Sequence, residues 1–446
     1  MPRFLDLFLY EIRQSKDKIK KLLTISKGKL QLYESLFPKY WNSLPDIQYF
    51  KGEVFAVDSS DGIIEYRDGV VIHVCRALAL SNTRKECREL KVNIFYDPRK
   101  RNDLVIFRSR MREHMEHLVS LKCLNNYNED LNSRVLLLDG SLYGRMSHVP
   151  KDSEIPGYQS FMLDYIETYS NLLKKSKEKN IPIIGVSKDS RSRLLGRILL
   201  THKLKNYLTR SSLNSETETA ILSSWSEIWK RPRNALRKIE KVSKETTIPS
   251  EIKEVFKEAL TSRPDIQIIS SLIKEPGYTT PLILGIPTPA LDPLLYALES
   301  GTLETYVENN FSKALVEEGE EIVEKAKKIL LKIFEYPAIY MFYYIPGKNE
   351  IPLRIDVPGW TLGFNYHMDD VKSYETLYSE NKLEWILNML NSFYAGPKHY
   401  NVLLEEVDLK VKLKQRNLIT IYESALMKEL KMLIEHTRDV RRVKYP

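Results

Sequence analysis

The alternation of apolar and polar positions predicts a strand-rich first half of the chain. An apolar run at 54–57 predicts a strand, and two further runs at 69–80 and 90–96, separated by a polar turn, extend it into an antiparallel meander. Apolar residues at helical spacing over 105–124 predict a helix, and the run 135–138 predicts a fourth strand. The next predicted elements are a helix over 158–177, a strand over 181–186 and a helix over 191–200.

This order of elements predicts the fold class, an α/β protein built on a ribonuclease-H-like mixed sheet with flanking helices. In that layout the first and fourth strands lie side by side, so the residues that end their apolar runs come together. The layout alone does not assign a function, because it also carries phosphotransferases and inactive modules.

The rest of the sequence extends this core, predicted to span residues 51–201, with three further regions. Residues 1–50 are predicted to be helical, with an amphipathic stretch over 5–36 that is expected to pack on the protein's own core or, as the alternative, to dock onto a partner. The Lys/Arg-rich segment 202–262 lacks strand patterns and predicts an inserted helical subdomain. A C-terminal α/β extension over 263–446 has predicted strands at 266–274, 282–287, 338–344 and 353–357 and predicted helices at 311–334, 383–393 and 416–436.

Length, charge and cysteine content limit the number of folding units, the kind of partner and the compartment. A chain of 446 residues is long enough for more than one folding unit, and its net charge of +9 favours a polyanionic partner such as nucleic acid. The three cysteines show no CxxC spacing, which fits a reducing compartment. No apolar run approaches the ~18 residues that a membrane span needs, so we expect a cytoplasmic protein without a membrane partner.

The predicted chemistry centres on two aspartates. Asp58 and Asp139 each follow an apolar run and precede turn-forming residues, so both are expected at strand ends, next to each other. Phosphodiester hydrolysis uses divalent cations held by clustered carboxylates, and Mn²⁺ and Mg²⁺ prefer such oxygen ligands. The alternative is that each aspartate only forms a turn.

A third acid is expected on the helix between the meander and the fourth strand. Glu113 and Glu116 are the candidates, and helical phase favours Glu116, because it flanks the apolar face whereas Glu113 lies nearly opposite. His114 and His117 are expected to be solvated neighbours of this acid rather than ligands.

Other candidates lie farther along the chain. Lys188 follows a predicted strand and could hold a phosphate, although a surface lysine is an equal alternative. Asp356 lies within an apolar strand, which is unusual for a surface acid. His367, Asp369 and Asp370 favour a turn over a metal site. The basic residues that follow Trp225 and Trp229 suit a DNA backbone, or else a solvated helix face; they include Lys230, Arg231 and Arg233.

Several sequence motifs are absent. The chain contains no GxxxxGK[ST], GxGxxG, HExxH or GxSxG motif, so P-loop, dinucleotide-binding, zincin and serine-hydrolase functions lack support. Any ATP-driven motion must come from a partner.

Six short segments, in this order, resemble the NurA family of archaeal and bacterial nucleases. They are AVDSS around Asp58, REHMEHL with Glu116, LLLDGSL around Asp139, GVSK ending at Lys188, RIDVP around Asp356, and the C-terminal HYNVLLEEVDLKV. The resemblance implies that Asp58, Glu116 and Asp139 bind Mn²⁺ or Mg²⁺ in a ribonuclease-H-like domain. It further implies a homodimeric 5′ to 3′ exonuclease and single-strand endonuclease that acts on DNA with a HerA-type hexameric ATPase in the resection of double-strand breaks.

The sequence departs from the family near its C-terminus. Where the family often reads YPxxLxxAH, this chain has Asn401 for proline, Val407 for alanine and Asp408 for histidine. An aspartate can coordinate a metal but cannot act as a cationic phosphate contact. A DNA-end-binding adaptor of a translocase with weak or no catalysis is therefore the alternative function.

Overall fold

The computed structural model describes residues 3–97, 100–126, 134–261, 263–287, 290–371 and 380–431. Contacts between Cα atoms divide the chain into two compact units. The larger unit comprises 45–187, 281–342 and 354–446, and the smaller comprises 1–44, 188–280 and 343–353. Within the described ranges, every helix is too short or too polar to span a lipid bilayer.

A mixed sheet forms the framework of the larger unit. Its strands are β2 (Glu53–Glu65), β3 (Val70–Ser81), β4 (Glu86–Tyr96), β5 (Arg134–Asp139), β6 (Ile183–Ser187), β8 (Leu282–Leu284), and most of β9 (Ile339–Ile345) and β10 (Leu353–Pro358). The order β4-β3-β2-β5-β6-β10 is antiparallel except for the parallel pairs β2/β5 and β5/β6. The predicted α/β class, the three-stranded meander and the pairing of the first and fourth strands are therefore confirmed.

The prediction that the first strand ends at Asp58 is wrong. β2 continues to Glu65, because β3 pairs with every residue of this extension, from Ser59 opposite Ala77 to Glu65 opposite Val71. The pairing of β2 with β5 does end here, and its last matched residues are Val57 on β2 and Leu138 on β5. Asp58 thus lies within a continuous strand, at the position where its parallel neighbour stops.

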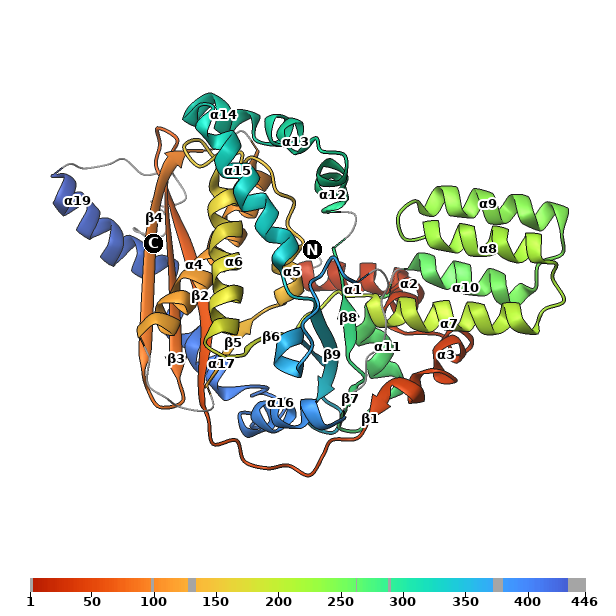
Figure 1. Ribbon diagram of the computed structural model, residues 1–446. Helices are drawn as coiled ribbons and strands as arrows, with labels where there is room; N and C mark the ends of the chain where they lie inside the picture. Colours follow the sequence, from red (N-terminus) through yellow and green to blue (C-terminus); the bar gives the residue numbers. More distant parts are fainter. Residues whose placement is uncertain are drawn as a thin grey trace. The chain divides into compact units, whose positions relative to one another are not determined.

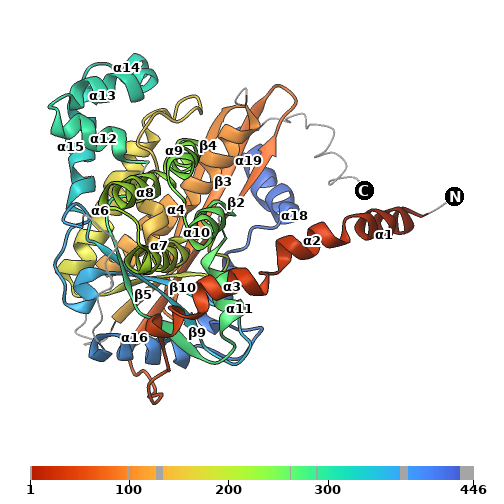
Figure 2. The same ribbon diagram turned by 90° about the vertical axis from the view of Figure 1, so that its right-hand side faces the viewer.

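Helices cover both faces of this sheet. α4 (Arg101–Asn126) packs on β2, β3 and β4, and α6 (Phe161–Glu178) packs on α4, as Figure 1 shows. α17 (Val402–Val411) also contacts β2 and β3, and α19 (Ser424–Leu430) lies across the sheet from α4 (Figure 2). The other helices are α5 (Leu142–Met146), α12 (Asp292–Glu299), α13 (Leu303–Asn310), α14 (Ser312–Glu318), α15 (Glu321–Leu331), η2 (Lys332–Glu335), η3 (Gly359–Leu362), α16 (Glu380–Ser392), α18 (Gln415–Asn417) and the π-helical η4 (Leu418–Glu423).

The smaller unit is mainly helical. A bundle of four helices, without a strand, covers residues 202–261, the described part of the predicted basic segment (Figures 1 and 2). These helices are α7 (Leu194–Arg210), α8 (Ser215–Glu227), α9 (Pro232–Glu245) and α10 (Ser250–Thr261). The remaining elements are α1 (Phe4–Gln14), α2 (Lys16–Leu23), α3 (Lys27–Glu34), η1 (Phe37–Tyr40), β1 (Trp41–Asn42), α11 (Asp265–Leu272), β7 (Gly277–Thr279) and the end of β9.

Three other element predictions are wrong. The segment 266–274 was expected to be a strand but belongs largely to α11, because Asp265, Ile268 and Ile269 are buried at helical spacing. The N-terminal stretch is helical as predicted, in three helices, but α1 buries none of its residues and so does not pack on the core as expected. The predicted helix 311–334 is interrupted at Gly319, which has a positive φ of 81°. The predicted C-terminal helix is described only as far as Leu430 and Lys431, and its remainder lies outside the described residues.

Candidate active site

The two predicted aspartates meet beside the parallel pair β2/β5. Val57 is matched to Leu138 in the register, so the next residues, Asp58 and Asp139, follow on neighbouring strands. Both side chains line a cavity of about 530 Å³ in the larger unit. The other charged or ionisable side chains that line this acid cleft are Arg112, Glu113, Glu116, Arg145 and His148.

Glu116 is held in place by two donors. Ser59, the residue after Asp58, faces α4 and donates from Oγ to Glu116 Oε1 over 2.6 Å, and Arg145 Nη2 donates to Oε2 over 2.5 Å. Glu116 is only 5% exposed, and this burial raises its pKa even though Arg145 acts in the opposite direction. Glu116 lines the acid cleft, and its role as the helix acid stays a prediction.

Glu113 lies in the same cleft, so helical phase does not separate the two glutamates. It accepts hydrogen bonds from Tyr165 Oη over 2.6 Å and from His148 Nε2 over 2.7 Å. Burial acts to raise the pKa of Glu113, but the contacts with His148 outweigh it and hold the value at about 2. Glu113 is therefore an ionised partner of His148 at the edge of the cleft.

Asp58 has a strongly perturbed carboxyl group. Its pKa is raised to about 8, first by burial and then by the nearby carboxylates of Glu116, Asp139 and Asp408. The backbone N–H of Ser59 donates to Asp58 Oδ1 over 2.7 Å and opposes this shift only in part. A concentration of negative charge of this kind is a favourable environment for a cation.

Arg145 connects the acids of the cleft. It lies on the short helix α5, just after β5, and it also donates to the Asp139 carbonyl oxygen over 3.0 Å. Its Nη1 lies 3.1 Å from His117 Nε2. His114 and His117 are not solvated, as the sequence led us to expect, but buried, since the ring of His117 stacks on Tyr169 at 4.5 Å and that of His114 packs edge-on against Phe161. Burial lowers the pKa of both imidazoles, to about 3 for His114.

Arg112 was missed by the sequence reasoning. It lines the cleft with a side chain that is 46% exposed, and its Nε lies 3.5 Å from Asp61 Oδ1. Arg108 takes the closer contact with Asp61, at 2.6 Å. Arg112 precedes Glu116 by four residues on α4 and so shares its helix face, a spacing that could have identified it.

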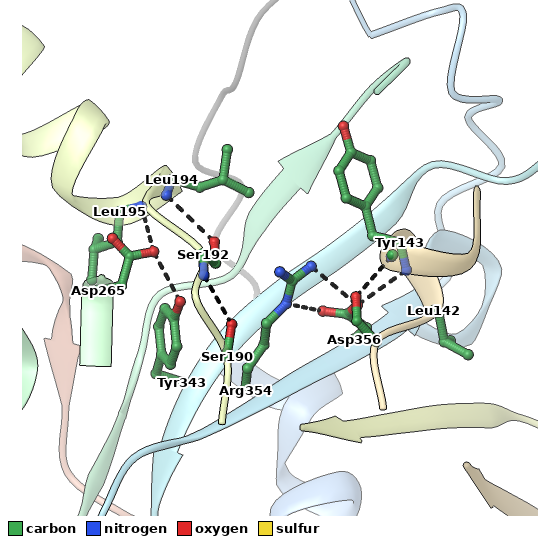
Figure 3. Close-up of polar contacts among 12 residues, drawn as sticks. Leu142, Tyr143, Ser190, Ser192, Leu194, Leu195, Asp265, Tyr343, Arg354 and Asp356 are labelled. Atoms are coloured by element: carbon green, nitrogen blue, oxygen red, sulfur yellow. Dashed lines mark hydrogen bonds and ion pairs between the residues drawn. The ribbon is translucent and has the colours of Figure 1, made fainter. Parts of the chain in front are cut away.

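Asp356 is fully buried and does not line the acid cleft. Arg354 donates to it from Nε over 2.7 Å and from Nη2 over 3.1 Å. Ser141 Oγ and the backbone N–H of Tyr143 donate to its Oδ2 over 2.5 and 3.1 Å. Figure 3 shows Arg354 and Tyr143 on either side of Asp356. Asp356 therefore fixes the turn between Asp139 and Arg145.

A second buried aspartate, drawn in Figure 3, belongs to the smaller unit. Asp265 accepts hydrogen bonds from the backbone N–H groups of Leu195 and Gly196, over 3.1 and 2.8 Å, and from Tyr343 Oη over 2.8 Å. Burial raises its pKa to about 6. Asp265 anchors the start of α7, and the sequence reasoning did not single it out.

The predicted cationic residues lie in the smaller unit. Lys188 directly follows β6, as the sequence predicted. Lys230 and Arg231 connect α8 to α9, and Arg233 lies in the first turn of α9. A contact of these side chains with DNA stays a prediction.

The C-terminal departures from the family lie on or beside α17. Asn401 caps this helix, since its side chain accepts a hydrogen bond from Leu404 N over 3.0 Å. Asp408 lies close enough to Asp58 to raise its pKa. Asp370 accepts a hydrogen bond from the backbone N–H of His367 over 2.9 Å, which is consistent with the predicted turn.

The donor chemistry of the cleft fits a hard divalent cation. Asp58, Glu116 and Asp139 supply carboxylate oxygens, which Mn²⁺ and Mg²⁺ prefer, and burial together with the neighbouring carboxylates raises the pKa of Asp58, as expected for clustered acids. In the described part of the chain, no three His, Cys, Asp or Glu side chains stand at metal-ligand spacing. Both carboxylate oxygens of Glu116 are instead occupied by Ser59 and Arg145.

Comparisons with a family model and with solved structures point to the same family of proteins. The family model for the NurA domain matches residues 52–413. The crystal structure of the NurA nuclease from Sulfolobus solfataricus shares 13% identity, with a TM-score of 0.54 over 97% of this chain and 100% of that one. A crystal structure of NurA bound to dAMP and manganese shares 15% identity, with a TM-score of 0.40 over 96% and 99% of the two chains. The comparison with curated protein sequences finds no match.

Proposed function

Because this chain belongs to the NurA family, as the sequence resemblance predicted, we propose that it is a divalent-metal-dependent nuclease that hydrolyses DNA phosphodiester bonds. One observation carries the proposal: three separate segments of the chain bring Asp58, Glu116 and Asp139 into one cleft together with Arg112 and Arg145. The similar structure from Sulfolobus solfataricus is named a nuclease, which agrees with this chemistry.

The cofactor that suits the cleft is Mn²⁺ or Mg²⁺, held by Asp58, Glu116 and Asp139. When bound, such an ion neutralises phosphate charge and supplies an activated water. The chain's own residues have distinct roles. Arg145 and Ser59 orient Glu116, and the exposed guanidinium of Arg112 contacts a DNA phosphate.

Asp356 acts as a positioning residue, since it binds the turn that carries Arg145. Lys188, Lys230, Arg231 and Arg233 contact the DNA backbone outside the cleft, in keeping with the net charge of +9.

Finer features of the function rest on the family resemblance. We propose 5′ to 3′ exonuclease and single-strand endonuclease activity, on single- and double-stranded DNA, in the resection of broken ends for homologous recombination. The proposed partners are a HerA-type hexameric ATPase and a second copy of this chain. The proposed compartment is the cytoplasm, where the thiols of Cys75, Cys87 and Cys123 are stable.

Cleavage of end-labelled single-stranded DNA in Mn²⁺ by the full chain tests the proposal. Wild type degrades the substrate, and Asp139→Asn does not. Asp164→Asn is the matched control, because this exposed acid on α6 pairs only weakly with Lys325, at 3.6 Å, and lies outside the cleft lining. Equal degradation by wild type and Asp139→Asn would contradict the proposed mechanism.

A DNA-end-binding adaptor with weak catalysis is the second candidate. It is favoured by one observation, that Ser59 and Arg145 occupy both carboxylate oxygens of Glu116. This function predicts salt-sensitive DNA binding without cleavage in either Mn²⁺ or Mg²⁺.

A further inference from the structure

The larger unit contains a second cavity, of about 340 Å³, whose lining shares no described residue with the acid cleft. Its volume lies within the range of small-molecule sites. One wall is the C-terminal half of α6, and the other is the segment that follows β10. Buried Leu173 and Tyr336 line it together with the aromatic rings of Trp360, Phe364 and Tyr366.

The aromatic rings form a stack that ends in solvent. The rings of Tyr340 and Phe364 are 5.3 Å apart and nearly parallel, at 15°, and those of Phe364 and Tyr366 are 6.5 Å apart at 16°. Tyr340 is fully buried, whereas Tyr366, at the other end of the stack, is 48% exposed. A stack of this kind can be extended by one more flat ring, and every nucleobase has a suitable face.

Polar groups at the same place match a nucleotide. Trp360 Nε1 is buried and has no hydrogen-bond partner among the described residues, so its N–H is available to donate a hydrogen bond to a base carbonyl or ring nitrogen. Lys174 and Lys177 stand on the rim and can contact a phosphate. Glu178 and Glu335 share that rim, so the aromatic rings, rather than net charge, mark the site.

We propose that this aromatic pocket binds one base of a single DNA strand at a position away from the acid cleft. The choice of DNA as the polymer rests on the proposed function; the recognition of a base does not. α6 connects the two sites, because Tyr165 on this helix hydrogen-bonds to Glu113 in the cleft and Lys177 lines the pocket. These α6 residues are separated by about 18 Å at ~1.5 Å per residue, a distance that a short run of nucleotides spans.

Photocrosslinking tests the pocket without catalysis. The full chain is incubated in EDTA with an oligothymidine that contains 5-iododeoxyuridine, irradiated, and mapped by mass spectrometry. The expected adducts are on Trp360, Phe364 or Tyr366. Tyr366→Ala is expected to remove them and to weaken oligonucleotide binding about 5- to 100-fold, the loss of one stacked base. Tyr296→Ala, at a tyrosine that is 71% exposed and lies outside both cavities, is the matched control.

The outcomes separate this proposal from the proposed function. Crosslinks confined to other segments, or Tyr366→Ala binding as tightly as Tyr296→Ala, would overturn the pocket assignment. Thymidine monophosphate competing as strongly as the oligonucleotide would overturn the assignment to a strand. If wild type crosslinks at Tyr366 but fails to cleave DNA in Mn²⁺, the nuclease proposal fails and the pocket stands. Asp139→Asn is expected to crosslink like wild type.

Discussion

Arg145 Nη2 lies 2.5 Å from Glu116 Oε2, and the two residues are only 4% and 5% exposed. An arginine and a glutamate from different elements thus form a buried ion pair at the base of the acid cleft. Ser59 completes the contacts of the glutamate, so the position of one proposed metal ligand depends on two residues that need not touch the metal.

Replacing Arg145 leaves a buried carboxylate without its partner. Arg145→Gln is expected to lower the free energy of unfolding by about 3–5 kcal/mol, measured by chemical denaturation. The double variant Arg145→Gln/Glu116→Gln should recover part of this loss, because the unpaired charge is gone. A double variant whose destabilisation equals the sum of the two single effects would show that the pair is not coupled.

Arg112 should affect cleavage but not stability. Its side chain is 46% exposed, so Arg112→Gln is expected to change the free energy of unfolding by less than about 0.5 kcal/mol. Loss of its phosphate contact should lower kcat/KM for DNA cleavage about 10- to 100-fold. Arg101→Gln is the matched control, an exposed arginine on α4 that pairs with Glu65 outside the cleft. Equal rates for the two variants would remove Arg112 from the site.

Glu113 should make stability depend on acid pH. Its pKa in the folded protein is about 2, against an ordinary value of 4.5, so its ionised form stabilises the fold above about pH 4.5 and this contribution is lost as the pH falls toward 2. The difference in unfolding free energy between wild type and Glu113→Gln is expected to shrink by about 2–3 kcal/mol over that range. A difference independent of pH would show that Glu113 is not held ionised.

Asp58 should give the free energy of unfolding the opposite pH dependence to that of Glu113. Burial and the neighbouring carboxylates raise its pKa from 3.8 to about 8, so without metal the free energy of unfolding falls as the pH rises through this range. In EDTA above about pH 8, Asp58→Asn is therefore expected to melt at a higher temperature than wild type. Added Mn²⁺ should raise the melting temperature of wild type and leave Asp58→Asn unchanged. An equal response of both proteins to Mn²⁺ would place the ion elsewhere.

The sequence predicted the structure correctly where the local hydrophobic pattern and the order of the strands agree. The adjacency of Asp58 and Asp139 follows from parallel pairing of two apolar runs, and the register that matches Val57 with Leu138 confirms this pairing. The continuation of β2 past Asp58 could not be predicted, because pairing with β3 overrides the turn preference of Ser59 and Gly62.

Tertiary contacts explain the other differences between the predicted and the observed structure. The short apolar run in α11 is compatible with a strand or a helix until its buried positions are known. Arg145 enters the site only because the turn after β5, fixed by Asp356, brings it back toward α4. Its place six residues after Asp139 carries no periodic signal, so its pairing with Glu116 is visible only in three dimensions.

The position of a bound metal ion distinguishes a catalytic acid cleft from an inactive one. Crystals of the protein soaked in MnCl₂ and measured at the manganese absorption edge should show an anomalous peak bounded by the carboxylates of Asp58, Glu116 and Asp139. A peak at another site, or none in this cleft from protein that cleaves DNA, would contradict metal binding by these three acids.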